Sequence, residues 1–248
     1  MKNNKEEIKK LLKKLKAGSS SKELVEKGKK LLSGISPSEL AILEQEIIEE
    51  GVTRKEMRKL CDVHLEAMKD SLTAELDLKP GHPVHTLMEE HKMILGFVDK
   101  LRLITTSFKC AKSYDEVKEE LELLKHISEH LVEADKHHQR EEDVLFPALE
   151  KQGVTEPPEI MREEHVDLKA NKAALYKLAR NHKKLKYADF VKKLEPISSY
   201  ICEELPKHIY KEDNILYPMA VQAIPGKAWA QLKVECDKIG YCCFTPAH

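Results

Sequence analysis

The sequence predicts an all-α protein: a four-helix, up-and-down bundle preceded by a small helical domain. Three observations lead to this fold class. Charged residues make up 34% and apolar residues 41% of the 248 positions, a balance typical of globular helical proteins. There are only nine glycines, and aromatic residues reach only 5%, which argues against a β-rich fold. Long segments with apolar residues at helical spacing are joined by short connections, as in antiparallel bundles.

Residues 1–78 are expected to form the small helical domain from short amphipathic helices. Gly18 and Gly51 separate neighbouring helices there, because glycine favours helix ends. The stretch DLKPGHP, from Asp77 to Pro83, is the strongest candidate for a domain boundary. We therefore expect a small domain over residues 1–78, a bundle over 82–224, and a C-terminal helix and tail over 225–248.

Four long helices are expected after Pro83. Their predicted ranges are residues 84–109, 113–153, 157–181 and 187–223. The fourth contains Pro196 and Pro206, and we expect it to be kinked or split because proline removes a helical hydrogen bond. A short helix after Pro225 and a tail from Gly240 complete the chain.

Charge and cysteine content narrow the classes of partner. Lys and Arg number 42 against 43 Asp and Glu, so no basic excess indicates nucleic acid. No apolar run is long enough to span a membrane, and none near Met1 resembles a signal peptide, so a cytoplasmic protein is expected. The six cysteines form no C-x-x-C pair, and we do not expect a disulfide framework.

An internal duplication is the strongest functional signal. The segment HHQREEDVLFP starts at His137, and HIYKEDNILYP starts at His208. The two align without a gap over eleven residues, so that His137 matches His208 and Glu141 matches Glu212. The first and third helices repeat as well, with the triplet EEH ending at His91 and again at His165. A repeated pair of helices packs naturally about a pseudo-twofold axis.

Helical geometry turns this repeat into a predicted metal site. In H-x-x-x-E the two side chains lie on one face, about 6 Å apart. The surrounding positions on these faces are apolar, and unpaired carboxylates there would be costly unless they met cations. Imidazole mixed with carboxylate suits iron, with zinc or manganese as alternatives, and two carboxylates related by a pseudo-dyad would bridge a pair of ions. The predicted ligands are His91, His137, Glu141, His165, His208 and Glu212.

The register of the second helix is ambiguous from the sequence. His138 and Glu142 have the same spacing as His137 and Glu141, and the apolar residues of that helix fit both. We choose His137 and Glu141 because the repeat aligns them with the second motif. His138 and Glu142 then become candidates for orienting the ligands. The role of His85 is open: it is either a helix cap or surface residue, or an extra ligand or a group that gates access to the site.

His130 is also open between two roles. It occupies the repeat position of Ile201 and should therefore face the core. There it would be either a hydrogen-bonded core residue or part of a polar relay toward the metals.

These motifs resemble the hemerythrin-type cation-binding domain, most closely its branch in di-iron proteins that repair iron centres. The resemblance covers about residues 82–222. It rests on EEH at His91, H-x-x-x-E-E-x-x-L-F-P at His137, M-x-x-E-H at His165 and H-x-x-x-E-x-x-x-L-x-P at His208. It implies two iron ions with an oxo or hydroxo bridge. Residues 1–78, with LCDVH and the following GHPVH, resemble a domain of unknown function that is often fused ahead of such bundles.

Two departures affect the function that the resemblance implies. Oxygen-carrying hemerythrins have a second histidine where this chain has Met161, and a differently spaced Asp where it has Glu212. We therefore do not expect simple reversible oxygen carriage. The leading hypothesis is a non-haem di-iron protein that binds or senses oxygen, nitric oxide or peroxide, in iron-centre repair or a stress response. The patterns do not distinguish binding from enzymatic turnover.

Two alternatives belong to other functional classes. One is a metal-responsive regulatory protein without catalysis that contacts a protein partner through residues 1–78. The other is a structural bundle that holds zinc. Homo-oligomers are compatible with each hypothesis, and neither nucleic acid nor a membrane is an expected partner.

Overall fold

The computed structural model describes residues 6–7, 45–51, 53 and 76–246, and within these the secondary structure is helical without a strand. The helices expected within 1–78 lie mostly outside the described residues. The chain divides into two compact units. The larger one comprises residues 78–148, 162–210 and 225–248, and the other contains residues 1–77, 149–161 and 211–224. Each is described by itself.

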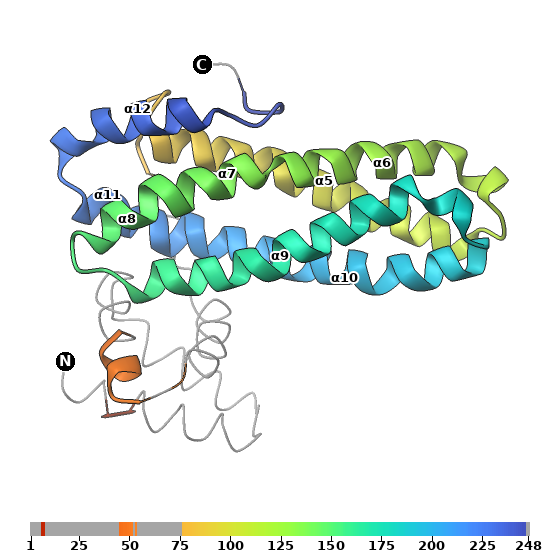
Figure 1. Ribbon diagram of the computed structural model, residues 1–248, viewed down its shortest axis with the longest axis horizontal. Helices are drawn as coiled ribbons and strands as arrows, with labels where there is room; N and C mark the ends of the chain where they lie inside the picture. The colour runs from red at the N-terminus through yellow and green to blue at the C-terminus, as the bar shows by residue number, and fades with distance from the viewer. Residues whose placement is uncertain (1–5, 8–44, 52, 54–75, 247–248) are drawn as a thin grey trace. The chain divides into compact units, whose positions relative to one another are not determined.

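The larger unit is a bundle of long helices that run beside one another (Figure 1). The helices are α5 (Pro83–Cys110), α6 (Lys118–Glu133) continued by α7 (Asp135–Arg140), α9 (Glu156–Arg180) and α10 (Tyr187–Lys211). A 3-10 turn, η1 (Tyr114–Val117), leads into α6, and another, η3 (His182–Lys184), precedes α10. The helical bundle expected from the sequence is confirmed, and the observed bounds of α5 extend the expected ones by one residue at each end.

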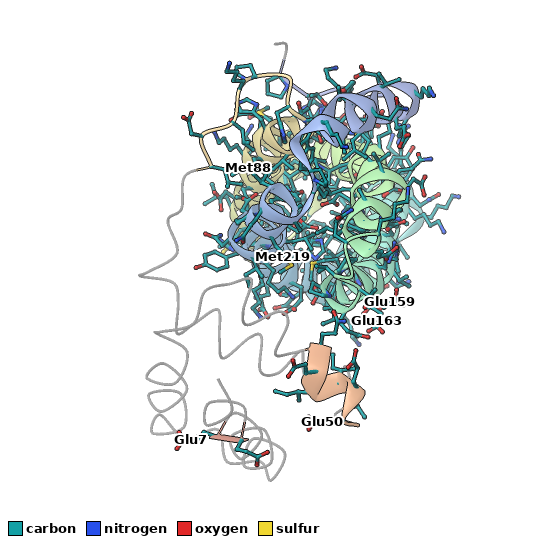
Figure 2. The ribbon with its side chains drawn as sticks, turned by 90° about the vertical axis from the view of Figure 1, so that its left-hand side faces the viewer. Glu7, Glu50, Met88, Glu159, Glu163 and Met219 are labelled. Carbon is teal, nitrogen blue, oxygen red and sulfur yellow. The ribbon has the colours of Figure 1, made fainter. Side chains whose placement is uncertain are left out.

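The bundle is held together by one apolar face from each helix. Figure 2 looks along the bundle from one end and shows side chains between the helices. Phe108 and Phe190 meet edge to face at 5.4 Å at one end of the interior. Burial of such side chains from water is the main force that packs amphipathic helices. The fully buried members of this core include Leu101, Phe108, Leu124, Ile127, Leu131, Leu175, Phe190 and Ile201.

The proline-containing helix does not split at either proline. Pro196 and Pro206 both lie inside the continuous helix α10. The expected interruption is instead found after it, in η4 (Glu212–Leu216), a short π-helix followed by α11 (Tyr217–Ala223). The second helix of the bundle shows the same change, with the π-helix η2 (Glu141–Leu145) between α7 and α8 (Phe146–Glu150).

A C-terminal helix and tail cover part of the bundle. After the 3-10 turn η5 (Gly226–Ala228), α12 (Trp229–Ile239) packs against α5, α7 and η2. Gly240 has φ of 87°, a conformation that glycine adopts without strain, and it ends α12 and directs the tail back over the bundle. The expected C-terminal helix is therefore present.

The smaller unit is described only in part. Residues 45–49 are helical, and Gly51 follows with φ of 99°, so the helix ends at the expected glycine. The side-chain amide of Gln45 contacts the backbone of Gly153 and Thr155 at 3.5 Å. Among the described residues, no helix is both long and apolar enough to cross a membrane.

Candidate metal centre

All six predicted ligands are buried, with exposed fractions between 0 and 2%. Five of them lie in the bundle unit: His91 on α5, His137 on α7, Glu141 in η2, His165 on α9 and His208 on α10. Glu212 is assigned to the other unit, and it follows His208 by one helical turn along an uninterrupted helical run.

One pair of imidazoles faces each other across the first two helices. The Nε2 atoms of His91 and His137 lie 3.0 Å apart. Two nitrogen ligands bound cis to one ion at about 2.1 Å would lie roughly 3 Å apart. The spacing of His91 and His137 therefore matches that of two ligands of the same cation.

Glu141 lies between imidazoles from two different helices. Its Oε2 atom is 3.5 Å from Nε2 of His137 and 3.5 Å from Nε2 of His165. Because His137 belongs to the pair with His91, and His165 belongs to a separate group, the carboxylate stands where it can serve two cation positions at once. This is the place that a bridging ligand would occupy.

A second imidazole group forms on the other side of Glu141. His138, His165 and His208 offer ligand atoms that all lie within 4.8 Å of one another. The rings of His165 and His208 have centroids 4.8 Å apart, and His138 stacks on His165 at 3.9 Å. The bundle therefore contains two groups of imidazoles with a carboxylate between them.

Carboxylates behind the imidazoles repeat with the internal duplication. Nδ1 of His137 donates to Glu90 at 2.7 Å, and Nδ1 of His208 donates to Glu164 at 2.8 Å. Glu90 and Glu164 are equivalent in the repeat, since each precedes the histidine of its EEH triplet. Because a carboxylate accepts a hydrogen bond, Nδ1 bears the proton in each ring, and Nε2 keeps the lone pair that a metal needs.

His165 has its own support from the second helix. Its Nδ1 donates to Glu142 at 2.7 Å, and Lys169 donates to the same oxygen at 2.9 Å. Burial alone would raise the pKa of Glu142, but these two hydrogen bonds outweigh it and lower the pKa to about 2. Glu142 thus remains ionised and fixes the ring of His165.

Glu90 is the centre of a buried ionic network. Burial favours a higher pKa for Glu90, yet the hydrogen bond from His137 and the charge of Arg140 lower it to about 2. Arg140 donates from Nη2 to both carboxylate oxygens at 2.7 and 2.6 Å. Thr245 of the C-terminal tail donates to Glu90 as well, and the ring of Tyr241 lies 4.8 Å from the guanidinium. The tail therefore contributes directly to the contacts that orient His137.

Burial also decides the protonation of the imidazoles on α7. It lowers the pKa of His137 to about 3 despite the hydrogen bond to Glu90. Burial, with nearby His165 and Lys172, lowers the pKa of His138 well below its ordinary value of 6.5. Both rings are therefore neutral at pH 7, which is the form that binds metals.

The π-helices coincide with the two predicted glutamate ligands. In η2 the amide of Phe146 donates to the carbonyl of Glu141, five residues back, and in η4 Tyr217 donates to Glu212 in the same way. A proline follows in each case, and its missing amide removes the regular bond that would otherwise compete. Such one-turn widenings are frequent at functional sites because they change where side chains point.

Both histidine–glutamate pairs of the second helix, His137 with Glu141 and His138 with Glu142, take part in the cluster, but in different ways. Glu141 is fully buried, whereas the side chain of Glu142 is 26% exposed and supports His165 from outside. His137 and His138 both point inward, one toward each imidazole group. The sequence treated His138 as a residue that orients ligands, and its place within an imidazole group is a feature that spacing did not reveal.

His82 and His130 lie outside this cluster. Nδ1 of His82 accepts from the amide of Val84 at 3.2 Å and caps α5. The His130 ring is half-buried, stacks on Phe97 at 4.9 Å and contacts Sγ of Cys243 at 3.1 Å. Its Nε2 atom also lies 3.0 Å from Nε2 of His126, so the ring lies between the core residue Phe97 and the C-terminal tail.

Comparison with known families agrees with this arrangement. The sequence model of a family described as the hemerythrin HHE cation binding domain matches residues 82–220. A family of unknown function, DUF438, matches residues 8–74. No curated protein matches the chain.

Proposed function

Because the chain belongs to the hemerythrin HHE cation-binding family, we propose that its buried histidines and glutamates hold two iron ions that bind oxygen, nitric oxide or peroxide. The observation that carries this proposal is the position of Glu141, whose Oε2 is equidistant from His137 and His165 at 3.5 Å. A carboxylate between two imidazole groups lies where a ligand shared by two cations would lie.

The donor set fits iron. Neutral imidazoles and carboxylates together suit iron, and the same set accepts zinc or manganese. Burying this many polar groups without cations would be costly, since each would lose its hydration. The proposed ligands are His91 and His137 for one ion, His165 and His208 for the other, with Glu141 and Glu212 as the carboxylates. Glu212 joins the set because it lies one turn beyond His208 on the same helical face.

When bound, iron supplies a redox-active Lewis acid that takes up small diatomic ligands or peroxide. The chain's own residues perform three tasks around it. Glu90, Glu142 and Glu164 fix the rings of three histidines, so that their Nε2 atoms stay directed inward. The buried apolar core of the bundle excludes bulk water from the cluster of histidines and glutamates. Arg140 balances the charge of Glu90 and keeps this carboxylate an acceptor.

Metal analysis of the purified full-length chain is the first test. We expect two iron ions per chain, visible by elemental analysis and by Mössbauer spectroscopy of protein enriched in ⁵⁷Fe. His137→Ala and His208→Ala should each lose iron. His182→Gln is the matched control, because His182 is a buried histidine that bonds Ala179 at 2.8 Å, outside the cluster. Iron retained in both ligand variants would contradict the proposed site.

The small-molecule ligand is tested by rapid mixing. The reduced, iron-loaded protein is mixed separately with oxygen, nitric oxide and hydrogen peroxide, and the absorption spectrum is followed. A spectral change with at least one of them, absent from His137→Ala, supports the proposal. Zinc in place of iron, with unchanged spectra in all three mixtures, would replace it by a structural zinc bundle.

A further inference from the structure

A further pair of histidines lies on the outside of the bundle, apart from the proposed metal centre. His126 and His130 are four residues apart on α6, so their side chains project from the same face of this helix. His126 is exposed and His130 is half-buried. His130 precedes His137 by seven positions, about 10 Å along a helix, and neither histidine belongs to the six proposed ligands of the centre. The proposed function therefore assigns no role to either ring.

The two imidazoles approach each other through the same atom. Their Nε2 atoms are 3.0 Å apart, whereas their ring centroids are 4.2 Å apart and the ring planes are inclined at 86°. Because the rings are crossed rather than stacked, the in-plane lone pairs of both Nε2 atoms can point at one ion. Two nitrogens bound cis to an ion at about 2.1 Å would lie roughly 3 Å apart. Without an ion, one Nε2 donates a hydrogen bond to the other, and a cation would take the place of the shared proton.

His130 is held in this orientation by the core and by the C-terminal tail. Its ring stacks on Phe97 with 4.9 Å between centroids, and Phe244 meets it edge-on at 5.8 Å. Its Nδ1 atom lies 3.1 Å from Sγ of Cys243. With the proton on Nδ1 and directed at the sulfur, Nε2 keeps the lone pair that a metal needs, as the hydrogen bond to a carboxylate ensures for His137. One of the two rings is thus fixed before any ion binds.

The spacing of the pair is one that zinc sites use. The segment from His126 to His130 reads HISEH. Two histidines at this spacing on one helix are zinc ligands in peptidases with the motifs H-E-x-x-H and H-x-x-E-H, and in the first of these the glutamate is the general base. Glu129 is instead hydrogen-bonded to Arg180 of α9. The likeness therefore extends to the two ligands and not to hydrolysis.

We propose that His126 and His130 bind a divalent transition-metal ion of the zinc type through their Nε2 atoms. Imidazole suits zinc, copper and nickel, and two ligands at a protein surface leave the remaining coordination positions to water. The negative charges of Glu129 and Glu133 act on His130 and favour a cation beside it. This site goes beyond the proposed function, and it does not depend on which metal the bundle holds.

A metal ion at this site acts on the C-terminal tail. The ring of His130 is the surface on which Cys243 and Phe244 pack, and the next residue, Thr245, donates to Glu90. An ion that fixes His130 therefore stabilises the tail in the position that supplies this hydrogen bond. The backbone amides of residues 241–246 should exchange their hydrogens with solvent more slowly when zinc is bound, because local opening of the tail then costs more free energy.

Zinc binding is measured in the full-length, iron-loaded chain by competition with a chromophoric chelator. Wild type should bind one zinc ion more than His126→Asn, and His130→Asn should lose the same ion. Either substitution should raise the dissociation constant by at least about tenfold, since removing a ligand costs no less than removing a residue that supports one. Because His126 is exposed, its replacement should leave the fold and the iron content unchanged.

His182→Gln is the matched control, because Nδ1 of His182 bonds to the carbonyl of Ala179 and not to another imidazole. This variant should keep the zinc ion. Hydrogen exchange followed by mass spectrometry then compares residues 241–246 with and without zinc, in wild type and in His126→Asn.

The outcomes separate the zinc site from the iron centre. Loss of one zinc ion from both variants of the pair, with zinc kept in His182→Gln and slower exchange of the tail in wild type alone, supports the proposal. Equal zinc binding by wild type and His126→Asn would overturn it and leave the contact as a hydrogen bond only. Loss of zinc without any change in tail exchange would overturn the link to the tail. A chain that takes up no iron, yet binds the zinc ion that His126→Asn loses, would contradict the proposed function and support this inference.

Discussion

Arg140 and Glu90 offer a test of how the chain stabilises the supports of its proposed metal ligands. The Arg140 side chain is 1% exposed and Glu90 is fully buried. Arg140 donates to both oxygens of Glu90, and Glu90 also accepts from His137 and Thr245. Replacing Arg140 by leucine leaves a buried carboxylate without its compensating cation.

The expected magnitude follows from burial. Removing one partner of a buried ion pair costs about 3–5 kcal/mol, mostly because the remaining charge is desolvated. Replacing both charges removes that penalty. The double variant Glu90→Gln/Arg140→Leu should therefore be more stable than Arg140→Leu alone, even though it contains one more substitution. The amide oxygen that Glu90→Gln introduces still accepts the hydrogen bond of His137, which isolates the charge effect.

Urea titrations of the metal-free chain, with chelator present, measure the free energy of unfolding. The matched control is Arg180→Leu, which removes an Arg–Glu pair whose side chains are 53% and 44% exposed. It should cost less than about 1 kcal/mol, because solvent screens exposed pairs. If the double variant were less stable than Arg140→Leu, or if the two Arg variants lost the same stability, the reasoning about buried charge would be refuted.

Three further predictions concern the same surroundings. Thr245→Val should destabilise the metal-free protein by about 1–2 kcal/mol in urea titrations, because Glu90 loses a donor, and Thr245→Ser should recover most of it. Burial lowers the pKa of His137 to about 3 and that of His138 well below 6.5, so below pH 6.5 the unfolded chain binds more protons than the folded chain. The free energy of unfolding of the metal-free protein should therefore fall as the pH falls below 6.5, by up to about 1.4 kcal/mol per pH unit for each histidine. A flat profile between pH 7 and 5 would contradict this. Glu164→Gln should weaken iron binding by about 10–100-fold in competition with a chelator, and adding chelator to wild type should lower its melting temperature, because only the folded chain binds tightly.

The sequence predicted the helices of the bundle well because each carries its own signals. Val84 to Lys109 was expected as the first helix, and α5 runs from Pro83 to Cys110. The fourth helix was expected to be kinked or split at Pro196 or Pro206, and it is not split at either. Those prolines are accommodated inside α10, and the real irregularity is a π-helix that begins at Glu212. Helical periodicity cannot show a local change of hydrogen-bond register. The proline after each glutamate motif is the sequence signal from which the π-helices could have been predicted.

Residue spacing along the chain could not predict which residues hydrogen-bond to the proposed metal ligands. Glu90 and Glu164 were visible as members of the repeated EEH triplet, but their targets lie on neighbouring helices and depend on packing. Arg140 and Thr245 reach Glu90 from α7 and from the C-terminal tail, contacts between positions 50 and 155 residues apart. The place of His138 was ambiguous because adjacent residues differ by about 100° around a helix, and only a wide interior accommodates both.

Positions that match between the two halves of the repeat and positions that differ carry different information about function. Equivalent positions, such as Glu90 and Glu164, make the same hydrogen bond in both halves, so the repeat would account for the two cation positions that we propose. The repeat aligns His138 with Ile209 and Lys172 with Val98, so these two buried polar residues occur in one half only. A polar residue kept in an otherwise apolar, symmetric interior costs stability unless it interacts with something that the other half does not hold.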